Sequence, residues 1–378
     1  MIAWVVELLS DFWQPLQVLH YITVRAVLAG AFAFLLALWL GRRVIDRLRE
    51  VGVHENAGAC DSAAVGAIAV KAGKNRTPTM GGVFWTASIL ASTLLFARPD
   101  EPLVLLGAVL LVGMGLLGFL DDWVKWQRDK GRNGLSRTSK LLATIALSTY
   151  VAVVLWMLGE RTGRPEISNI YFPVLKGLYA QPEILGAWGL LLFVAFTSFV
   201  ILATSHAVNV TDGLDGLAGG AGLISIAALS LAVYAVGNAS VAGYLHLPHI
   251  PGAGEVAVLG GAALGATLGF LWFNCHPAEI FLGDSGSLPL GALIGYMALV
   301  AKQELVLPFL AGVFVLEVSS SLLQILWFKA SGGKRLFSIA PIHHKFQLAG
   351  MAEQKIVARF WIFGAVSACV GLLLIKVR

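Results

Sequence analysis

Long apolar runs recur along the whole chain, and most of them have the length of a membrane-spanning helix. A helix needs about 20 predominantly apolar residues to cross the hydrocarbon core of a bilayer. Ten segments reach or approach that length, at roughly 24–41, 81–97, 102–120, 140–158, 186–204, 216–236, 256–273, 286–301, 305–328 and 357–376. The pattern predicts an all-α polytopic membrane protein with about ten transmembrane helices, forming a single domain over residues 1–378.

The composition supports this interpretation. Of the 378 residues, 57% are hydrophobic and only 13% are charged, whereas a soluble domain carries about 25% charged residues. A water-soluble globular protein is therefore excluded. The first residues include Glu7 and Asp11 instead of a basic region, so a removable signal peptide is not expected. The three cysteines are scattered and lack CxxC spacing, which indicates neither a disulfide framework nor a zinc site.

The basic residues predict the orientation of the helices. The connections 42–80, 121–140 and 329–359 contain 19 of the 27 Lys and Arg residues, and they follow the first, third and ninth predicted spans. All three connections therefore lie on one side, and the excess of positive charge makes that side cytoplasmic. With ten spans, both termini are then expected on the periplasmic side.

Two connections differ from the rest in composition. Residues 159–185 alternate β-forming residues around two prolines, so a small periplasmic β-hairpin and a plain loop are equally compatible with the sequence. Residues 56–73 are rich in Ala and Gly and are expected to form a flexible cytoplasmic insertion.

Aspartates gather in three of the cytoplasmic connections. Asp121 and Asp122 end the third predicted span in GFLDDWVKW, Asp212 and Asp215 occur in NVTDGLDGLAGG, and Asp284 occurs in EIFLGDSGSL. Each motif alone has a structural explanation, as a solvated helix end, a turn stabilised by an Asx cap or a helix N-cap. A carboxylate at membrane depth costs about 2.5–3.5 kcal/mol and usually marks function. Because all five face the same side, we expect them to converge on one site.

The charges around these aspartates indicate a site for a divalent cation and phosphates. Segments 204–215 and 274–285 contain no Lys or Arg, so they form a locally negative pocket. Mg²⁺ prefers oxygen ligands, takes one or two carboxylates and leaves positions for substrate phosphates. Basic side chains that can screen two approaching phosphates come from the other connections, namely Lys74, Lys125, Lys140, His343, His344 and Lys345.

Further motifs fit the same chemistry. In KNRTPTMGG, Lys74 and Thr77 precede the second span, although a structural turn explains this stretch equally well. Adjacent histidines cannot face one way on a helix, so APIHHKFQLAG favours phosphate contact or a proton relay over a paired zinc site. Phe281 is a candidate to stack on a base and Asn274 to hydrogen-bond one, with core packing as the alternative.

The ninth predicted span also contains two polar side chains. Glu317 and Gln324 are spaced to lie on one face of the helix. We expect them to face the bundle interior, as structural contacts or as part of a substrate groove.

These motifs, in this order and with this sidedness, resemble one family of membrane transferases. KNRTPTMGG, GFLDDWVK with GLSRTSK, NVTDGLDGLAGG, FLGDSGSL and APIHHKF together resemble the phospho-N-acetylmuramoyl-pentapeptide-transferase family, a branch of the polyprenyl-phosphate N-acetylhexosamine-1-phosphate transferases. The resemblance covers nearly the whole chain. It implies Mg²⁺-dependent transfer of phospho-N-acetylmuramoyl-pentapeptide from its UDP carrier to undecaprenyl phosphate, giving lipid I and UMP, in the bacterial inner membrane. It also implies a homodimer, and no nucleic-acid partner is expected.

The resemblance assigns roles to individual residues. Asp284 resembles the Mg²⁺ ligand, and Asp121 and Asp122 resemble the catalytic pair. His343 and His344 resemble the histidine contacts of the last cytoplasmic loop, and Lys125 and Lys140 are expected to bind substrate phosphate. The uridine and diphosphate pocket is expected to consist of Lys74, Thr77, Asn209, Asp212, Asp215, Asn274 and Phe281.

Three features depart from the family pattern. Lys345 stands where the family usually has a third histidine, His206 stands where it usually has Asn, and the insertion 56–73 is longer than expected.

Two other functions remain open. A UDP-N-acetylglucosamine–undecaprenyl-phosphate N-acetylglucosamine-1-phosphate transferase shares the aspartate motifs. A secondary transporter is disfavoured, because the carboxylates lie at the cytoplasmic edge and not at the membrane midplane.

Overall fold

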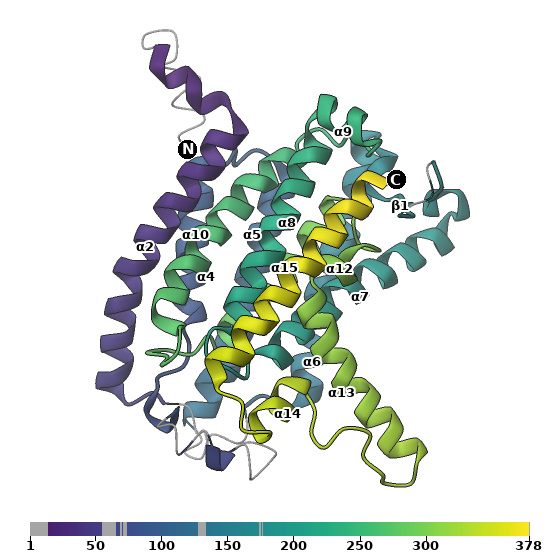
Figure 1. Ribbon diagram of the computed structural model, residues 1–378. Coiled ribbons are helices and arrows are strands. Elements are labelled where there is room, and N and C mark those ends of the chain that lie inside the picture. The colour runs from purple at the N-terminus through teal and green to yellow at the C-terminus, as the bar shows by residue number, and fades with distance from the viewer. Residues whose placement is uncertain are drawn as a thin grey trace.

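The structure is a bundle of long helices, most of which run side by side (Figure 1). The computed structural model describes residues 14–54, 66–68, 70, 74–127, 134–173, 175 and 177–377. Its α-helices are α2 (Ile22–Val51), α4 (Gly82–Phe96), α5 (Pro102–Gln127), α6 (Arg137–Thr162), α7 (Ala187–Thr211), α8 (Leu217–Gly237), α9 (Ala239–Leu245), α10 (Val256–Asn274), α11 (Asp284–Val300), α12 (Leu307–Leu310), α13 (Gly312–Ala330), α14 (Ile342–Leu348) and α15 (Glu353–Val377). Short 3₁₀ segments accompany them, among them η3 (Lys74–Arg76) and η6 (Ala253–Glu255).

Each of the ten apolar segments predicted from the sequence contains a helix. Among the described residues, eight helices are long and apolar enough to cross a membrane, namely α2, α5, α6, α7, α8, α10 with η6, α13 and α15. The chain is therefore a multi-pass membrane protein. The other two segments form the shorter helices α4, with 15 residues, and α11, with 17. The segment predicted at 305–328 is not continuous, because the chain breaks at Ala311 between α12 and α13.

The surface and the interior of the bundle both suit a lipid environment. Large apolar side chains such as Trp39, Phe199 and Trp272 are more than half exposed on the outer faces of their helices. Inside, small residues let the backbones approach closely: a side chain at Gly261 or Gly265 of α10 would meet the backbone of Ala26 or Gly30 in α2. Such small-residue contacts are typical of helix packing in membranes.

The basic connections share one end of the bundle. The end of α2, the start of α6, the segment α14 and the start of α15 lie at the lower end in Figure 1, and α9 lies at the opposite end. This arrangement confirms that the described parts of the three Lys- and Arg-rich connections face one side. The insertion predicted at 56–73 lies outside the described residues, apart from 66–68 and 70, which are helical.

A two-stranded sheet lies at the end of the bundle that also carries α9 (Figure 1). Strand β1 (Ile170–Tyr171) pairs antiparallel with β2 (Tyr179–Ala180), so that Tyr171 lies opposite Tyr179. The two tyrosine rings are 5.4 Å apart, a distance at which cross-strand aromatic pairs stabilise a hairpin. The hairpin, and not a plain loop, is therefore confirmed within 159–185.

A buried ion pair fastens α2 to the start of α10. The guanidinium of Arg25 donates to both carboxylate oxygens of Glu255, at 2.7 and 2.5 Å, and to the carbonyl oxygen of Phe96 at 3.2 Å. Glu255 also accepts the backbone N–H of Arg98 at 3.1 Å. Both charged side chains are less than a tenth exposed. The pair therefore joins three segments that are far apart in the sequence.

Breaking this pair should destabilise the protein strongly. Glu255→Ala leaves the guanidinium of Arg25 buried without its charge partner, which costs about 3–5 kcal/mol. A matched control is Glu50→Ala, because Glu50 pairs with Arg47 at 3.0 Å where both side chains are exposed, and such pairs contribute about 1 kcal/mol or less. The measurement is the melting temperature of each variant in detergent. Equal losses in the two variants would contradict the expectation.

Candidate active site

Three of the predicted aspartates form one cluster. Asp121 and Asp122 lie in the last turns of α5, and Asp284 is the first residue of α11. Carboxylate oxygens from the three residues lie within 4.8 Å of one another, and all three side chains are almost completely buried. The convergence predicted from the sequence is therefore present for these three aspartates, while Asp215 belongs to a second cluster described below.

Asp122 holds the beginning of α11. Its carboxylate oxygens accept the backbone N–H groups of Asp284 at 3.2 Å and Ser285 at 2.9 Å. The first N–H groups of a helix lack acceptors within the helix, so this carboxylate acts as its cap. The helices can approach this closely because Gly118 of α5 lies against the backbone of Asp284, where a side chain would collide.

Two lysines lie among the carboxylates. The ammonium group of Lys125 is 2.7 Å from Asp121 and 3.1 Å from Asp284, and that of Lys140 is 2.9 Å from Asp121 and also bonds Asp284. Asn209 of α7 donates to the other oxygen of Asp284 at 2.6 Å. Thus α5, α6, α7 and α11 each contribute a polar group to this cluster. Asn209 was expected with Lys74 and Asp215 in the uridine and diphosphate pocket, but it lies here beside Asp284.

The chemistry of the cluster fits Mg²⁺. Its potential ligands are carboxylate oxygens, the donors that Mg²⁺ prefers. Both oxygens of Asp122 already accept backbone N–H groups. By contrast, the Oδ2 atoms of Asp121 and Asp284 face positive charge, here the lysine ammonium groups. Asp284 and Asp121 are therefore better placed than Asp122 to hold a cation.

A second polar cluster contains Lys74 and Asp215. The ammonium group of Lys74 is 2.7 Å from the carboxylate of Asp215 and 2.6 Å from that of Glu353. His276 bonds the other oxygen of Asp215 at 2.9 Å. Burial alone would lower the pKa of Lys74, but the two carboxylates together raise it above its ordinary value. Sequence reasoning missed Glu353 and His276, since neither lies in a recognisable motif.

Phe281, Asn274 and Thr77, three other residues of the predicted uridine pocket, lie beside this second cluster. Phe281 presents its ring 5.9 Å from the ammonium group of Lys74. Asn274 is buried, and its side chain accepts from the backbone of Gly216 at 3.0 Å and donates to the carbonyl oxygen of Ile280 at 2.8 Å. The amide of Asn274 is therefore engaged in holding the loops together. Thr77 lies 3.5 Å from the carbonyl oxygen of Ala278. Asp212 is the C-cap residue that follows α7.

The two histidines of α14 point to different partners. His343 is completely buried and bonds Glu317 of α13 at 2.9 Å, and its ring packs against Gly213 in the loop that carries Asp212 and Asp215. His344 instead bonds Gln347 at 2.9 Å. Burial, together with the neighbouring His343, lowers the pKa of His344 to about 4.

The two polar residues of α13 have separate structural roles. Glu317 faces inward to His343, as predicted. Gln324 accepts from the backbone of Leu336 and Phe337, so it fixes the loop after α13. In α7, where the family pattern has Asn, a ring nitrogen of His206 is buried with no hydrogen-bond partner among the described residues.

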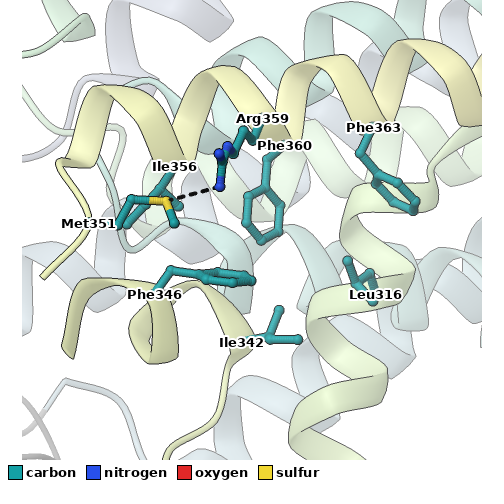
Figure 2. Close-up of a pocket in the computed structure, with 8 residues that line it drawn as sticks. All are labelled: Leu316, Ile342, Phe346, Met351, Ile356, Arg359, Phe360 and Phe363. Carbon is teal, nitrogen blue, oxygen red and sulfur yellow. Dashed lines mark hydrogen bonds between the residues drawn. The ribbon is translucent and has the colours of Figure 1, made fainter. Parts of the chain in front are cut away.

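An apolar cavity lies behind the histidine segment. Figure 2 shows side chains of α15 pointing toward those of α14 and α13. Arg359 is the one charged residue of its lining, and its guanidinium contacts the sulfur of Met351 at 3.7 Å. The apolar members are Leu316, Ile342, Phe346, Met351, Ile356, Phe360 and Phe363. None of the predicted site residues lines this cavity. It lies between α14 and the helices α13 and α15, against which α14 packs.

Comparison with known proteins identifies the class first. Residues 103–302 match the family described as glycosyl transferase family 4. This stretch runs from α5 to the end of α11 and contains both aspartates of α5, the Asp212–Asp215 loop and Asp284. The matched region is therefore the part of the fold that builds the carboxylate cluster.

Individual relatives narrow the class. The chain is 39% identical over 366 residues to the phospho-N-acetylmuramoyl-pentapeptide-transferase of Nitratidesulfovibrio vulgaris (strain DP4), covering 96% of each chain. It is 40% identical over 364 residues to that of Oleidesulfovibrio alaskensis, with 96% of each covered, and 38% identical over 375 residues to that of Aquifex aeolicus, with 98% of each covered. The chain belongs to the phospho-N-acetylmuramoyl-pentapeptide-transferase family. It is a transferase of peptidoglycan synthesis.

Acidic pH should destabilise the protein through His344. Between its native pKa of about 4 and the ordinary value of 6.5, the unfolded chain binds a proton that the native protein does not. Stability should therefore fall as pH drops from about 6.5 to about 4, and the fall should be smaller in His344→Gln. Melting temperatures measured across that range test this expectation, with exposed His249→Gln as the control. A wild-type profile that His344→Gln leaves unchanged would contradict it.

Proposed function

We propose that this enzyme transfers phospho-N-acetylmuramoyl-pentapeptide from UDP-N-acetylmuramoyl-pentapeptide to undecaprenyl phosphate, giving lipid I and UMP. The observation that carries the proposal is the cluster of Asp121, Asp122 and Asp284 with two lysines, in a chain about 39% identical to named transferases of this kind. We further propose that the site faces the cytoplasm, that the membrane is the bacterial inner membrane and that the enzyme acts as a homodimer.

The position of the cluster supports a reaction between a soluble and a lipid substrate. It lies where α5 ends and α11 begins, at the end of the bundle that carries the basic connections. A nucleotide can approach from water at that end, and a prenyl phosphate can keep its chain in the bilayer. The second cluster, around Lys74 and Phe281, supplies a cation and an aromatic face for the nucleotide.

The chemistry is a displacement at phosphorus. An oxygen of the lipid phosphate forms a bond to the β-phosphorus of the donor, the bond from that phosphorus to the bridging oxygen breaks, and UMP leaves with that oxygen. Lys125 and Lys140 hold positive charge where these phosphates would meet, which positions them and offsets their negative charge. Mg²⁺ held by Asp284, with Asp121 adjacent, would stabilise the charge that develops on the leaving group.

The two aspartates of α5 divide the remaining work. Asp122 is committed to the backbone of α11, so its role is to fix the site. We propose that Asp121 accepts a proton from the lipid phosphate at Oδ2, the oxygen beside Lys125 and Lys140, because its Oδ1 accepts the backbone N–H of Leu135 at 2.9 Å. We favour direct attack over a phosphosugar bound to aspartate, because a lipid phosphate is already an adequate nucleophile.

The choice of donor is the direct test. Purified enzyme given undecaprenyl phosphate and Mg²⁺ should release UMP with UDP-N-acetylmuramoyl-pentapeptide and much less with UDP-N-acetylglucosamine. Preference for the second donor would instead identify an N-acetylglucosamine-1-phosphate transferase. Radiolabelled donor without acceptor should leave the protein unlabelled, and label trapped on Asp121 or Asp122 would contradict the direct route.

Removing the proposed metal ligand should abolish most of the activity. Asp284→Asn keeps the size of the side chain and an oxygen, but it removes the charge that attracts Mg²⁺, so UMP release should fall by about 100-fold or more. Asp46→Asn on the exposed side of α2 is the matched control and should retain activity. UMP release that survives in Asp284→Asn at unchanged Mg²⁺ dependence would refute the assignment.

A further inference from the structure

Glu353, the first residue of α15, joins two parts of the proposed nucleotide pocket. A single carboxylate oxygen of Glu353 accepts from the ammonium group of Lys74 at 2.6 Å and from the backbone N–H of Asp215 at 2.8 Å. Its other oxygen lies 4.0 Å from His276. One side chain thereby fixes both a cation and a loop backbone.

The contact is shielded from water. The side chains of Lys74, Asp215 and Glu353 are 12%, 3% and 11% exposed. Charge-assisted hydrogen bonds at such sites are short and strong, and truncating one partner leaves the other charge without compensation. The ammonium group of Lys74 bonds both carboxylates, so it supplies positive charge to this cluster.

The same helix holds the loop at a second point. Trp361 of α15 donates to the carbonyl oxygen of Gly216 at 3.2 Å, while Asn274 accepts the N–H of Gly216 at 3.0 Å. Gly216 has a φ of +79°, a left-handed conformation that favours glycine. The loop that ends in Asp215 and Gly216 is therefore fixed by three hydrogen bonds to its backbone. Glu353 and Trp361 of α15 make two of them, and Asn274 makes the third.

We infer that Glu353 is a positioning residue for the donor nucleotide. It acts through Lys74, whose ammonium group it fixes 5.9 Å from the ring of Phe281, and through the backbone of Asp215. The inference rests on the proposed function, because it takes the Lys74 and Phe281 region as the donor pocket. Glu353 lies outside all the motifs recognised in the sequence, so the inference adds a new residue to the proposed donor pocket.

Substitution of Glu353 should weaken donor binding more than it slows chemistry. Glu353→Gln keeps an oxygen for the N–H of Asp215 but loses the charge that holds Lys74, so the KM for UDP-N-acetylmuramoyl-pentapeptide should rise about tenfold with kcat changed little. Glu353→Ala loses both contacts, and KM should rise about 100-fold. The larger effect of Ala, partly rescued by Gln, separates the two contacts.

A matched control lies at the same end of the molecule. Glu279 pairs with Arg42 at 3.6 Å and Arg49 at 3.7 Å, and its side chain is 43% exposed. Glu279→Gln removes a charge close to the pocket without touching Lys74, so its KM should match that of the wild type. Melting temperatures of all variants show whether each is folded, and Glu353→Gln alone carries the test if the Ala variant does not fold.

A double-mutant cycle separates positioning from a merely structural role. If Glu353 acts through Lys74, Glu353→Gln should not weaken donor binding further in a Lys74→Met background. The readout is the Kd for UDP-N-acetylmuramoyl-pentapeptide by calorimetry, which does not require turnover. Additive losses in the cycle, or a Glu353→Gln enzyme that behaves like Glu279→Gln, would overturn the inference. Absence of UMP release by the wild-type enzyme would instead overturn the proposed function.

Discussion

The bond between the carboxylate of Asp122 and the first peptide groups of α11 is the contact on which the candidate site depends. All 17 residues of α11 are buried, so its first N–H groups cannot be satisfied by water. Asp122 supplies the acceptors from the end of α5, and Gly118 lets the two backbones meet. Asp121 is next to Asp122 in α5, and Asp284 is the first residue of α11. The contact between these two helix ends therefore places the carboxylates of Asp121 and Asp284 close together.

Carboxylates so close to one another repel, and two lysines offset this repulsion with positive charge. Three negative charges share the junction with the ammonium groups of Lys125 and Lys140. Lys125 follows Asp121 by one helical turn on α5, whereas Lys140 comes from α6, so the cluster also ties these two helices together. The lysines that neutralise the carboxylates are therefore the same side chains that we propose contact the substrate phosphates.

The sequence predicted the parts of the fold that follow from hydropathy. Each of the ten apolar segments contains a helix, and the basic connections share one end of the bundle, because length and charge placement determine these features. The break at Ala311 and the short helix α14 were not predicted, since tertiary packing decides where an apolar stretch is interrupted. The motifs predicted that five aspartates converge, and three of them do, whereas Asp215 lies in the second cluster with Lys74.

Residues that act through single long-range contacts were beyond the reach of the sequence. Glu353 resembles an ordinary acidic residue in the first turn of a helix, where the dipole favours negative charge. His276 lies in the segment 274–285, which was expected to be locally negative and to contribute Asn274 and Phe281, but no role was expected for His276. Asn274 was predicted to contact a base, yet its amide is bonded to the backbone of Gly216 and Ile280. Glu353 and His276 both meet Asp215, 138 and 61 residues away in the sequence, and only the fold shows these contacts.

Helix α15 connects the two halves of the site through opposite kinds of chemistry. Glu353, its first residue, bonds Lys74, and Trp361 further along the helix bonds the loop at Gly216, so both hold the side of the site that we propose for the nucleotide. Along its apolar face, Phe360 packs beside α14 around the cavity of Figure 2, and α14 in turn places His343 against Gly213. The Asp212–Asp215 loop is therefore held directly by α15, and also by α14, which packs against α15. A helix long enough to span a membrane thus also shapes the pocket that we propose for the donor nucleotide, close to the cluster where we propose that the lipid phosphate reacts.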